Sequence, residues 1–85
     1  MYYTYILESQ KTGKLYIGQT KDIEKRLARH NRGGTPSTQS GRPWKLLFYM
    51  SFSSRSEAVQ LEGKLKSWKN PDRIRAWIGR QEDHQ

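Results

Sequence analysis

Two short tyrosine-rich runs near the N-terminus constrain the fold of this chain more than any other stretch. They cover residues 2–7 (Tyr-Tyr-Thr-Tyr-Ile-Leu) and residues 14–19 (Lys-Leu-Tyr-Ile-Gly-Gln). Aromatic and β-branched residues favour strands, and the polar segment 9–13 between the runs is typical of a hairpin connection. The chain is therefore predicted to open with a β-hairpin.

The expected register of this hairpin sets Leu7 opposite Lys14. Tyr5 then lies directly opposite Tyr16, so that both phenols point to the same face of the sheet. A slip of one residue would separate them. Taken alone, two strand tyrosines are more typical of a packed core than of a functional site.

A helix is predicted over residues 23–31, because Thr20 or Asp22 can cap its first turn and Gly33 follows its end. Residues 32–43 contain almost no apolar side chain and are predicted to form a loop that is functional or mobile. The nearly continuous apolar run 44–52 is predicted to be a third strand with both faces largely covered.

Two further helices complete the predicted order. Ser54 and Glu57 match a capping box that opens the first, and Asn70 followed by proline opens the second, which is expected to end at Gly79. The order ββαβαα predicts an α+β fold, a small three-stranded antiparallel sheet with helices packed on it. Residues 1–79 are expected to form one domain, with 80–85 as a polar C-terminal tail.

The charge balance limits the class of partner. Sixteen Lys and Arg stand against eight Asp and Glu, a formal net charge of +8 over 85 residues, and 12% of the residues are aromatic. A folded basic domain of this kind favours a polyanionic partner, most often nucleic acid. No long apolar run or amphipathic basic anchor favours a membrane. The absence of cysteine excludes disulfides and thiolate metal sites, and a cytoplasmic setting is expected.

Five polar or ionisable residues lie beside apolar stripes on predicted regular elements, where a catalytic set could be held rigidly. They are Tyr5, Tyr16, Arg26, His30 and Glu62. Each has a plain structural alternative: core packing for the tyrosines, a solvated charge for the arginine, a surface position or a helix-dipole contact for the histidine. For the glutamate, the alternative is an i,i+4 ion pair with Lys66.

The order of these residues resembles the GIY-YIG nuclease superfamily, in its small stand-alone branch. The second strand motif is present as Tyr16-Ile17-Gly18, whereas the first reads Tyr3-Thr4-Tyr5 in place of Gly-Ile-Tyr. The helical segment 22–27 (Asp-Ile-Glu-Lys-Arg-Leu), His30 and Glu62 follow in the order of the family. The resemblance covers nearly the whole chain, from residue 2 to about residue 78.

The resemblance implies metal-dependent hydrolysis of phosphodiester bonds in DNA. Glu62 would hold a single Mg²⁺ or Mn²⁺ ion, and Arg26 would contact the scissile phosphate. Tyr16 would act as general base toward water, with Tyr5 hydrogen-bonded nearby. His30 would orient or deprotonate a tyrosine or the water.

Further residues are predicted to bind nucleic acid, through phosphate contacts, close backbone approach or stacking on unpaired bases. They are Gly18, Lys21, Lys25, Arg29, Arg32, Arg42 and Trp44. Single-stranded, flap, branched and duplex substrates all stay open, as does a requirement for a protein partner or a homodimer. The alternative function is a nucleic-acid-binding module on the same fold without cleavage. A scaffold whose basic surface recruits a protein is a third possibility.

Overall fold

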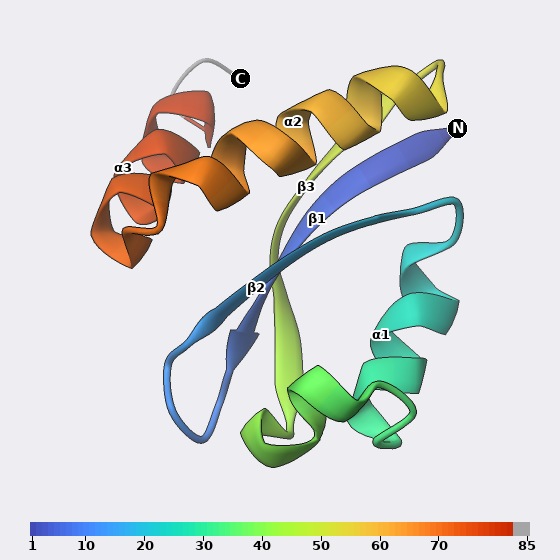
Figure 1. The fold of residues 1–85 in the computed structure, drawn as a ribbon, viewed down its shortest axis with the longest axis vertical. Coiled ribbons are helices and arrows are strands. Elements are labelled where there is room, and N and C mark those ends of the chain that lie inside the picture. The colour runs from blue at the N-terminus through green and yellow to red at the C-terminus, as the bar shows by residue number, and fades with distance from the viewer. Residues whose placement is uncertain (83–85) are drawn as a thin grey trace.

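Three antiparallel strands form the single sheet of this protein (Figure 1). The structure is a computed structural model and describes residues 1–82. The strands are β1 (Tyr2–Ser9), β2 (Leu15–Thr20) and β3 (Trp44–Phe52), and their order is β2-β1-β3. β1 is therefore the central strand, and the predicted α+β fold with a three-stranded antiparallel sheet is confirmed.

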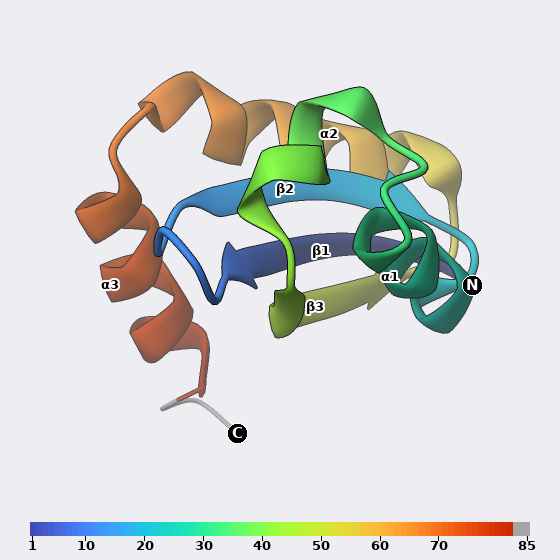
Figure 2. The ribbon, with the colours of Figure 1, turned by 90° about the horizontal axis from the view of Figure 1, so that it is seen from below.

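Helices cover both faces of the sheet (Figure 2). On one face lie α1 (Ile23–Asn31) and the short 3-10 helix η1 (Pro36–Gly41). On the other lie α2 (Arg55–Trp68) and α3 (Pro71–Glu82). Each face has its own apolar cluster, because the residues of a strand point alternately to opposite sides. Ile6, Phe48 and Leu65 belong to the cluster beneath α2 and α3, whereas Tyr5 and Leu7 belong to the cluster beneath α1.

Side-chain caps fix where the helices begin. Asp22 accepts a hydrogen bond from the Lys25 amide (3.1 Å) and Ser54 accepts one from the Glu57 amide (3.3 Å). Asn70 accepts one from the amide of residue 72 (2.9 Å). Each cap satisfies a backbone donor that has no partner within its helix. All three helices begin where the sequence predicts.

Four expectations about local structure are wrong in detail. The hairpin register is shifted by two residues, so that Tyr5 pairs with Gly18 and Leu7 with Tyr16. The faces of β3 are not both covered, because Lys45, Tyr49 and Ser51 are exposed, Tyr49 by 54%. The predicted loop 32–43 contains η1, and α3 continues past Gly79 to residue 82.

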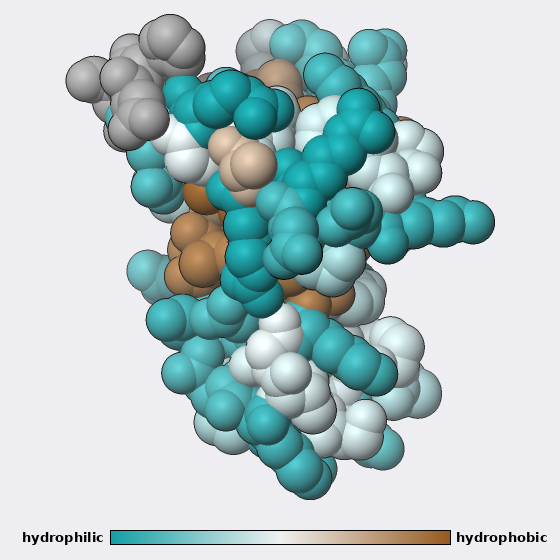
Figure 3. Space-filling view, turned by 90° about the vertical axis from the view of Figure 1, so that its left-hand side faces the viewer, coloured by the Kyte–Doolittle hydropathy of each residue, from teal (hydrophilic) through white to brown (hydrophobic). Residues whose placement is uncertain are grey.

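Residues 80–82, predicted to be part of a frayed polar tail, therefore form the last turn of α3, and residues 83–85 lie outside the described part of the chain. Figure 3 shows that α3 leaves some apolar surface uncovered between its own hydrophilic residues and those at the end of the hairpin. Within residues 1–82, none of the helices is long and apolar enough to cross a membrane.

Candidate active site

The observed register places the Tyr5 ring directly across Gly18. A Cβ atom built on Gly18 would lie 2.5 Å from the Tyr5 hydroxyl oxygen, so only glycine leaves room for the ring. Tyr16 lies two residues along β2 and points to the same face, with its ring 6.4 Å from that of Tyr5. A shift of two residues preserves the face of every side chain, and the predicted pairing of the two phenols on one face is therefore retained.

The hydroxyl of Tyr5 lies between two residues of α1. It is 3.1 Å from His30 Nε2, and it accepts a hydrogen bond from Arg26 Nε at 3.3 Å. Tyr5 and His30 are only 1% and 0% exposed. Arg26 and His30 are four residues apart on one helix, so both can reach the same atom of the neighbouring strand.

A threonine of η1 sets the direction of this hydrogen-bond chain. Thr38 Oγ1 donates its proton to the carbonyl of Thr35 (3.1 Å) and lies 2.9 Å from His30 Nδ1. A hydroxyl has one proton to donate, so with this proton on the Thr35 carbonyl the Nδ1–H of His30 is the donor to Thr38, and we assign this tautomer to His30. Nε2 of neutral His30 is then an acceptor, and the Tyr5 hydroxyl donates to it.

The electrostatics of the site are consistent with these proton positions. Burial, followed by the charges of Arg26 and Arg29, lowers the pKa of His30 and favours the neutral imidazole. Burial raises the pKa of the Tyr5 phenol, although the hydrogen bond from Arg26 opposes this effect. That hydrogen bond is also the main reason why the pKa of Arg26 is raised. Tyr5 and His30 are thus neutral, and Arg26 carries the positive charge.

Tyr16 completes the aromatic part of the site. Its ring lies edge-on to His30 with the two ring centres 4.8 Å apart, and it also contacts Trp44. Unlike Tyr5, Tyr16 is half-buried. It is therefore the more exposed tyrosine of the pair.

Glu62 lies on α2, which covers the opposite face of the sheet. Its side chain is 20% exposed and forms an ion pair with Lys66 Nζ at 3.0 Å. Burial is the main cause of the raised pKa of Tyr5, and the charge of Glu62 adds a minor contribution in the same direction. No group of three or more His, Cys, Asp or Glu side chains gathers anywhere in residues 1–82. A metal at this position would depend on one carboxylate, which suits Mg²⁺ with its retained waters and not a structural zinc site.

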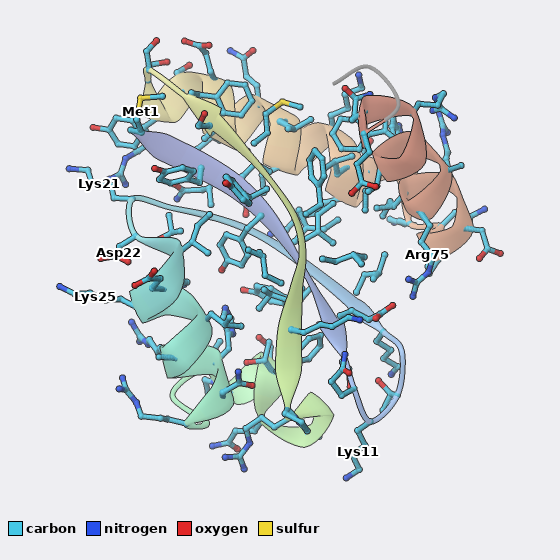
Figure 4. The ribbon with its side chains drawn as sticks, turned by 180° about the vertical axis from the view of Figure 1, so that it is seen from behind. Met1, Lys11, Lys21, Asp22, Lys25 and Arg75 are labelled. Atoms are coloured by element: carbon cyan, nitrogen blue, oxygen red, sulfur yellow. The ribbon has the colours of Figure 1, made fainter. Side chains whose placement is uncertain are left out.

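A basic groove leads outward from Arg26. It has a volume of about 260 Å³, and Lys21, Lys25 and Arg29 line it together with Arg26. Figure 4 shows Lys21 and Lys25 extending away from the sheet at the start of α1. Three of the predicted phosphate-binding residues thus lie on one surface beside the site.

Other predicted nucleic-acid contacts lie elsewhere. Arg32 is exposed at the end of α1, and Arg42 is exposed with its Nε bound to the Gln39 carbonyl at 2.9 Å. Gly18 is buried beneath the Tyr5 ring. Trp44 is 7% exposed, and its Nε1–H donates to the Thr38 carbonyl at 2.8 Å. The expectation that Trp44 stacks on unpaired bases is wrong, because its ring is part of the core.

Thr38 was missed as a member of the site. It is fully buried, although it lies in a polar segment without periodicity. A lone threonine in such a segment gives no signal of burial. The role of Asn31, the last residue of α1, was also not predicted: its side-chain amide exchanges hydrogen bonds with the backbone of Trp44 at 2.6 and 3.0 Å, which joins α1 to the start of β3.

A comparison with known protein families identifies the class of protein to which this sheet and its tyrosine, arginine and histidine side chains belong. The sequence matches the family model described as the GIY-YIG catalytic domain over residues 1–75. The chain belongs to the GIY-YIG catalytic domain family.

Its relatives include several small proteins with the name UPF0213. The UPF0213 protein SSP2268 of Staphylococcus saprophyticus is 37% identical over 75 residues, which covers 87% of this chain and 90% of that protein. A UPF0213 protein of Streptococcus pneumoniae is 42% identical over 72 residues, covering 84% and 72%. The solution NMR structure of the UPF0213 protein BH0048 of Bacillus halodurans is similar at a TM-score of 0.59 and 30% identity, covering 93% of this chain and 84% of that one.

Proposed function

We propose that this protein is a metal-dependent endonuclease that hydrolyses phosphodiester bonds of DNA, in DNA repair or processing in the cytoplasm. The observation that carries the proposal is the directed hydrogen-bond chain from Arg26 through Tyr5 and His30 to Thr38. A domain that only bound nucleic acid would need basic and aromatic surface, and no buried chain of this kind. Membership of the GIY-YIG family supports the same conclusion.

The hydrogen bonds divide the roles of the two tyrosines. Tyr5 donates its only proton to His30 and accepts from Arg26, and its pKa is raised, so it is a poor base toward water. Tyr5 instead positions Arg26. Tyr16 is only half-buried and lies beside Arg26, so Tyr16 is the general base in this proposal. His30 is fully buried with both nitrogens engaged and acts on Tyr5, not on water.

Arg26 supplies charge stabilisation. Its Nε is bound to Tyr5 and its guanidinium also lies beside Tyr16, and the planar fork of the guanidinium suits a phosphate oxygen. A guanidinium that is already oriented does not need to reorganise as charge develops on the phosphate. The adjoining groove with Lys21, Lys25 and Arg29 would bind neighbouring phosphates.

Glu62 would hold the divalent ion. A bound Mg²⁺ or Mn²⁺ supplies Lewis-acid polarisation of the phosphate and activation of water. The half-buried carboxylate and its electrostatic coupling to Tyr5 fit this assignment. The chain itself then contributes a general base, a phosphate ligand and the residues that fix both.

One observation favours the alternative function, a nucleic-acid-binding module without cleavage. The Glu62 carboxylate is bound to Lys66 Nζ at 3.0 Å, and this ion pair competes with a metal ion for the same oxygens. Lys66 is 54% exposed, and an i,i+4 ion pair of this kind is weak, about 0.3–0.5 kcal/mol. Glu62 would therefore exchange Lys66 for a divalent ion at little cost.

A cleavage panel tests the proposal. Single-stranded, duplex, flap and branched DNA are incubated with the protein and Mg²⁺ or Mn²⁺, with EDTA as the control. The proposal predicts metal-dependent internal cleavage of at least one form. Salt-dependent DNA binding without cleavage of any form would support the binding module instead. A requirement for a protein partner or a second copy would show as a dependence of the rate on protein concentration or on added extract.

A further inference from the structure

A second groove lies next to the site, where β2 meets the junction of α2 and α3. Its volume is about 380 Å³, within the range of about 300–1,000 Å³ that is typical of small-molecule sites. Half-buried Leu15 and exposed Pro71 give it an apolar surface above buried Leu65 and Ile74. The floor of the groove is therefore hydrophobic and is backed by the main core.

Three lysines surround this apolar floor. The groove is lined by Lys14, which precedes β2, by Lys66 of α2 and by Lys69, which caps the C-terminal end of α2. No acidic residue is among the lining residues. An apolar surface that is surrounded by lysines is complementary to a flat apolar group that is linked to anionic groups. A nucleobase with its flanking phosphates has this chemistry.

The groove adjoins the candidate active site at the edge strand β2. Tyr16 lines the groove between Leu15 and Ile17, while its ring lies on the α1 face of the sheet with Tyr5 and His30. Lys66 is the ion-pair partner of Glu62. A strand whose phosphate lies at Tyr16 and Glu62 would therefore bring its next base to the groove.

We propose that this groove binds an unpaired nucleobase beside the scissile phosphate, with the lysines on the adjoining phosphates. The proposal rests on the function given above, since it places one strand of DNA relative to the same site. A base inside a duplex is covered by its neighbours and its pairing partner, so it cannot enter a groove without unstacking. The groove thus selects for unpaired or easily unpaired DNA at this position.

Lys69 offers a conservative way to alter the groove. Its backbone is left-handed, with φ at 54°, a conformation that asparagine adopts more readily than lysine. Lys69→Asn therefore removes a rim charge while it keeps, or improves, the end of α2. Lys11→Ala is the matched control, because Lys11 is an exposed hairpin lysine that does not line the groove.

The test compares two strands of equal charge in EDTA, where no cleavage occurs. One is a short single-stranded oligothymidine, and the other is the same sugar–phosphate backbone without bases. Binding is followed by fluorescence anisotropy and by methyl NMR of Leu15, Leu65 and Ile74. We expect the abasic strand to bind about tenfold more weakly, given the usual contribution of a stacked base. Only the strand with bases should shift the groove methyl groups.

The Lys69→Asn variant should lose affinity for the oligothymidine, while Lys11→Ala should not. Equal affinity for the two strands, or binding without methyl shifts in the groove, would overturn the proposal, and so would equal shifts on adding a duplex. The outcome is separable from that of the proposed function. Methyl shifts in the groove of a protein that cleaves no DNA would support the groove proposal and refute the proposed nuclease activity. Cleavage without methyl shifts in the groove would support the nuclease activity and refute the groove proposal.

Discussion

The Tyr5 hydroxyl lies over Gly18 of the neighbouring strand so closely that a methyl group on Gly18 would overlap it at 2.5 Å. The same hydroxyl is the atom that joins Arg26 to His30. The space left by one glycine in β2 therefore determines the geometry of the whole hydrogen-bond chain. This relationship gives the first of five predictions.

Gly18→Ala should displace Tyr5 and break its hydrogen bonds to Arg26 and His30. Tyr5 is fully buried, so it cannot move aside freely, and overpacking of this kind costs about 1–3 kcal/mol. The free energy of unfolding from urea denaturation checks this value. Gly63→Ala is the control, because nothing lies within 4 Å of a Cβ there and alanine favours the helix by about 0.5–1 kcal/mol. Equal stabilities of the two variants would contradict the close approach.

Thr38→Val should leave the Nδ1–H of His30 without an acceptor. A buried donor that loses its partner costs about 1–3 kcal/mol, and valine has nearly the shape of threonine. The expected result is lower stability together with a change in the ¹⁵N shifts that report the His30 tautomer. Thr35→Val is the matched control, since Thr35 contributes its backbone carbonyl to the chain and its side chain forms no capping hydrogen bond. An unchanged tautomer in Thr38→Val would refute the assigned proton positions.

Acid should destabilise the protein through His30. The folded pKa of His30 is lowered by burial, so below the unfolded value of about 6.5 the unfolded chain binds more protons than the folded chain. Stability is therefore full above pH 6.5 and is lost as the pH falls toward the folded pKa. The check is the free energy of unfolding between pH 7.5 and 5.5, with His30→Gln as the comparison. The free energy of unfolding should change less steeply with pH in His30→Gln than in the wild type. An unchanged slope would assign the pH dependence to other groups.

Phosphate binding along α1 should depend on salt. Lys25 and Arg29 line the groove that begins at Arg26, and each phosphate contact contributes about one unit to the slope of log K against log salt. Lys25→Ala and Arg29→Ala should each reduce the affinity for DNA and lower that slope by about one. Lys11→Ala, at the far end of the hairpin, should leave the slope unchanged. Identical slopes of log K against log salt for all three variants would show that this groove does not belong to the DNA-binding surface.

Local signals in the sequence were sufficient to predict where the three α-helices begin. Asp22, Ser54 and Asn70 each precede an apolar periodic segment, and each caps its helix as predicted. The predicted hairpin register was wrong because the register depends on the turn. Ser9 extends β1, its hydroxyl accepts from the amides of residues 11 and 12, and its amide donates to Lys14 (2.9 Å), which shortens the connection. A side-chain-stabilised turn of this kind is not specified by alternation of polar and apolar residues.

The site was predicted less completely than the fold. The spacing of Arg26 and His30 placed them on one flank of a helix, but neither the burial of His30 nor its partner Thr38 could be derived from it. Both depend on η1 folding back over α1, which is a tertiary contact of an aperiodic segment. Trp44 was misassigned for the same reason, because its ring fills the space that η1 creates. Tertiary contacts of irregular segments leave no periodic pattern in a sequence.

The fifth prediction tests the assignment of Glu62. Glu62→Gln keeps the size of the side chain and removes the charge that would hold a divalent ion. Glu57→Gln is the matched control, since it makes the same change on the same helix at a capping position where glutamine is accepted. Both variants are assayed for DNA binding in EDTA and for cleavage in Mg²⁺ or Mn²⁺. The most direct measurement is the cleavage rate of Glu62→Gln relative to wild type: the nuclease predicts a fall of at least about a hundredfold with DNA binding intact, whereas cleavage at the wild-type rate would contradict it.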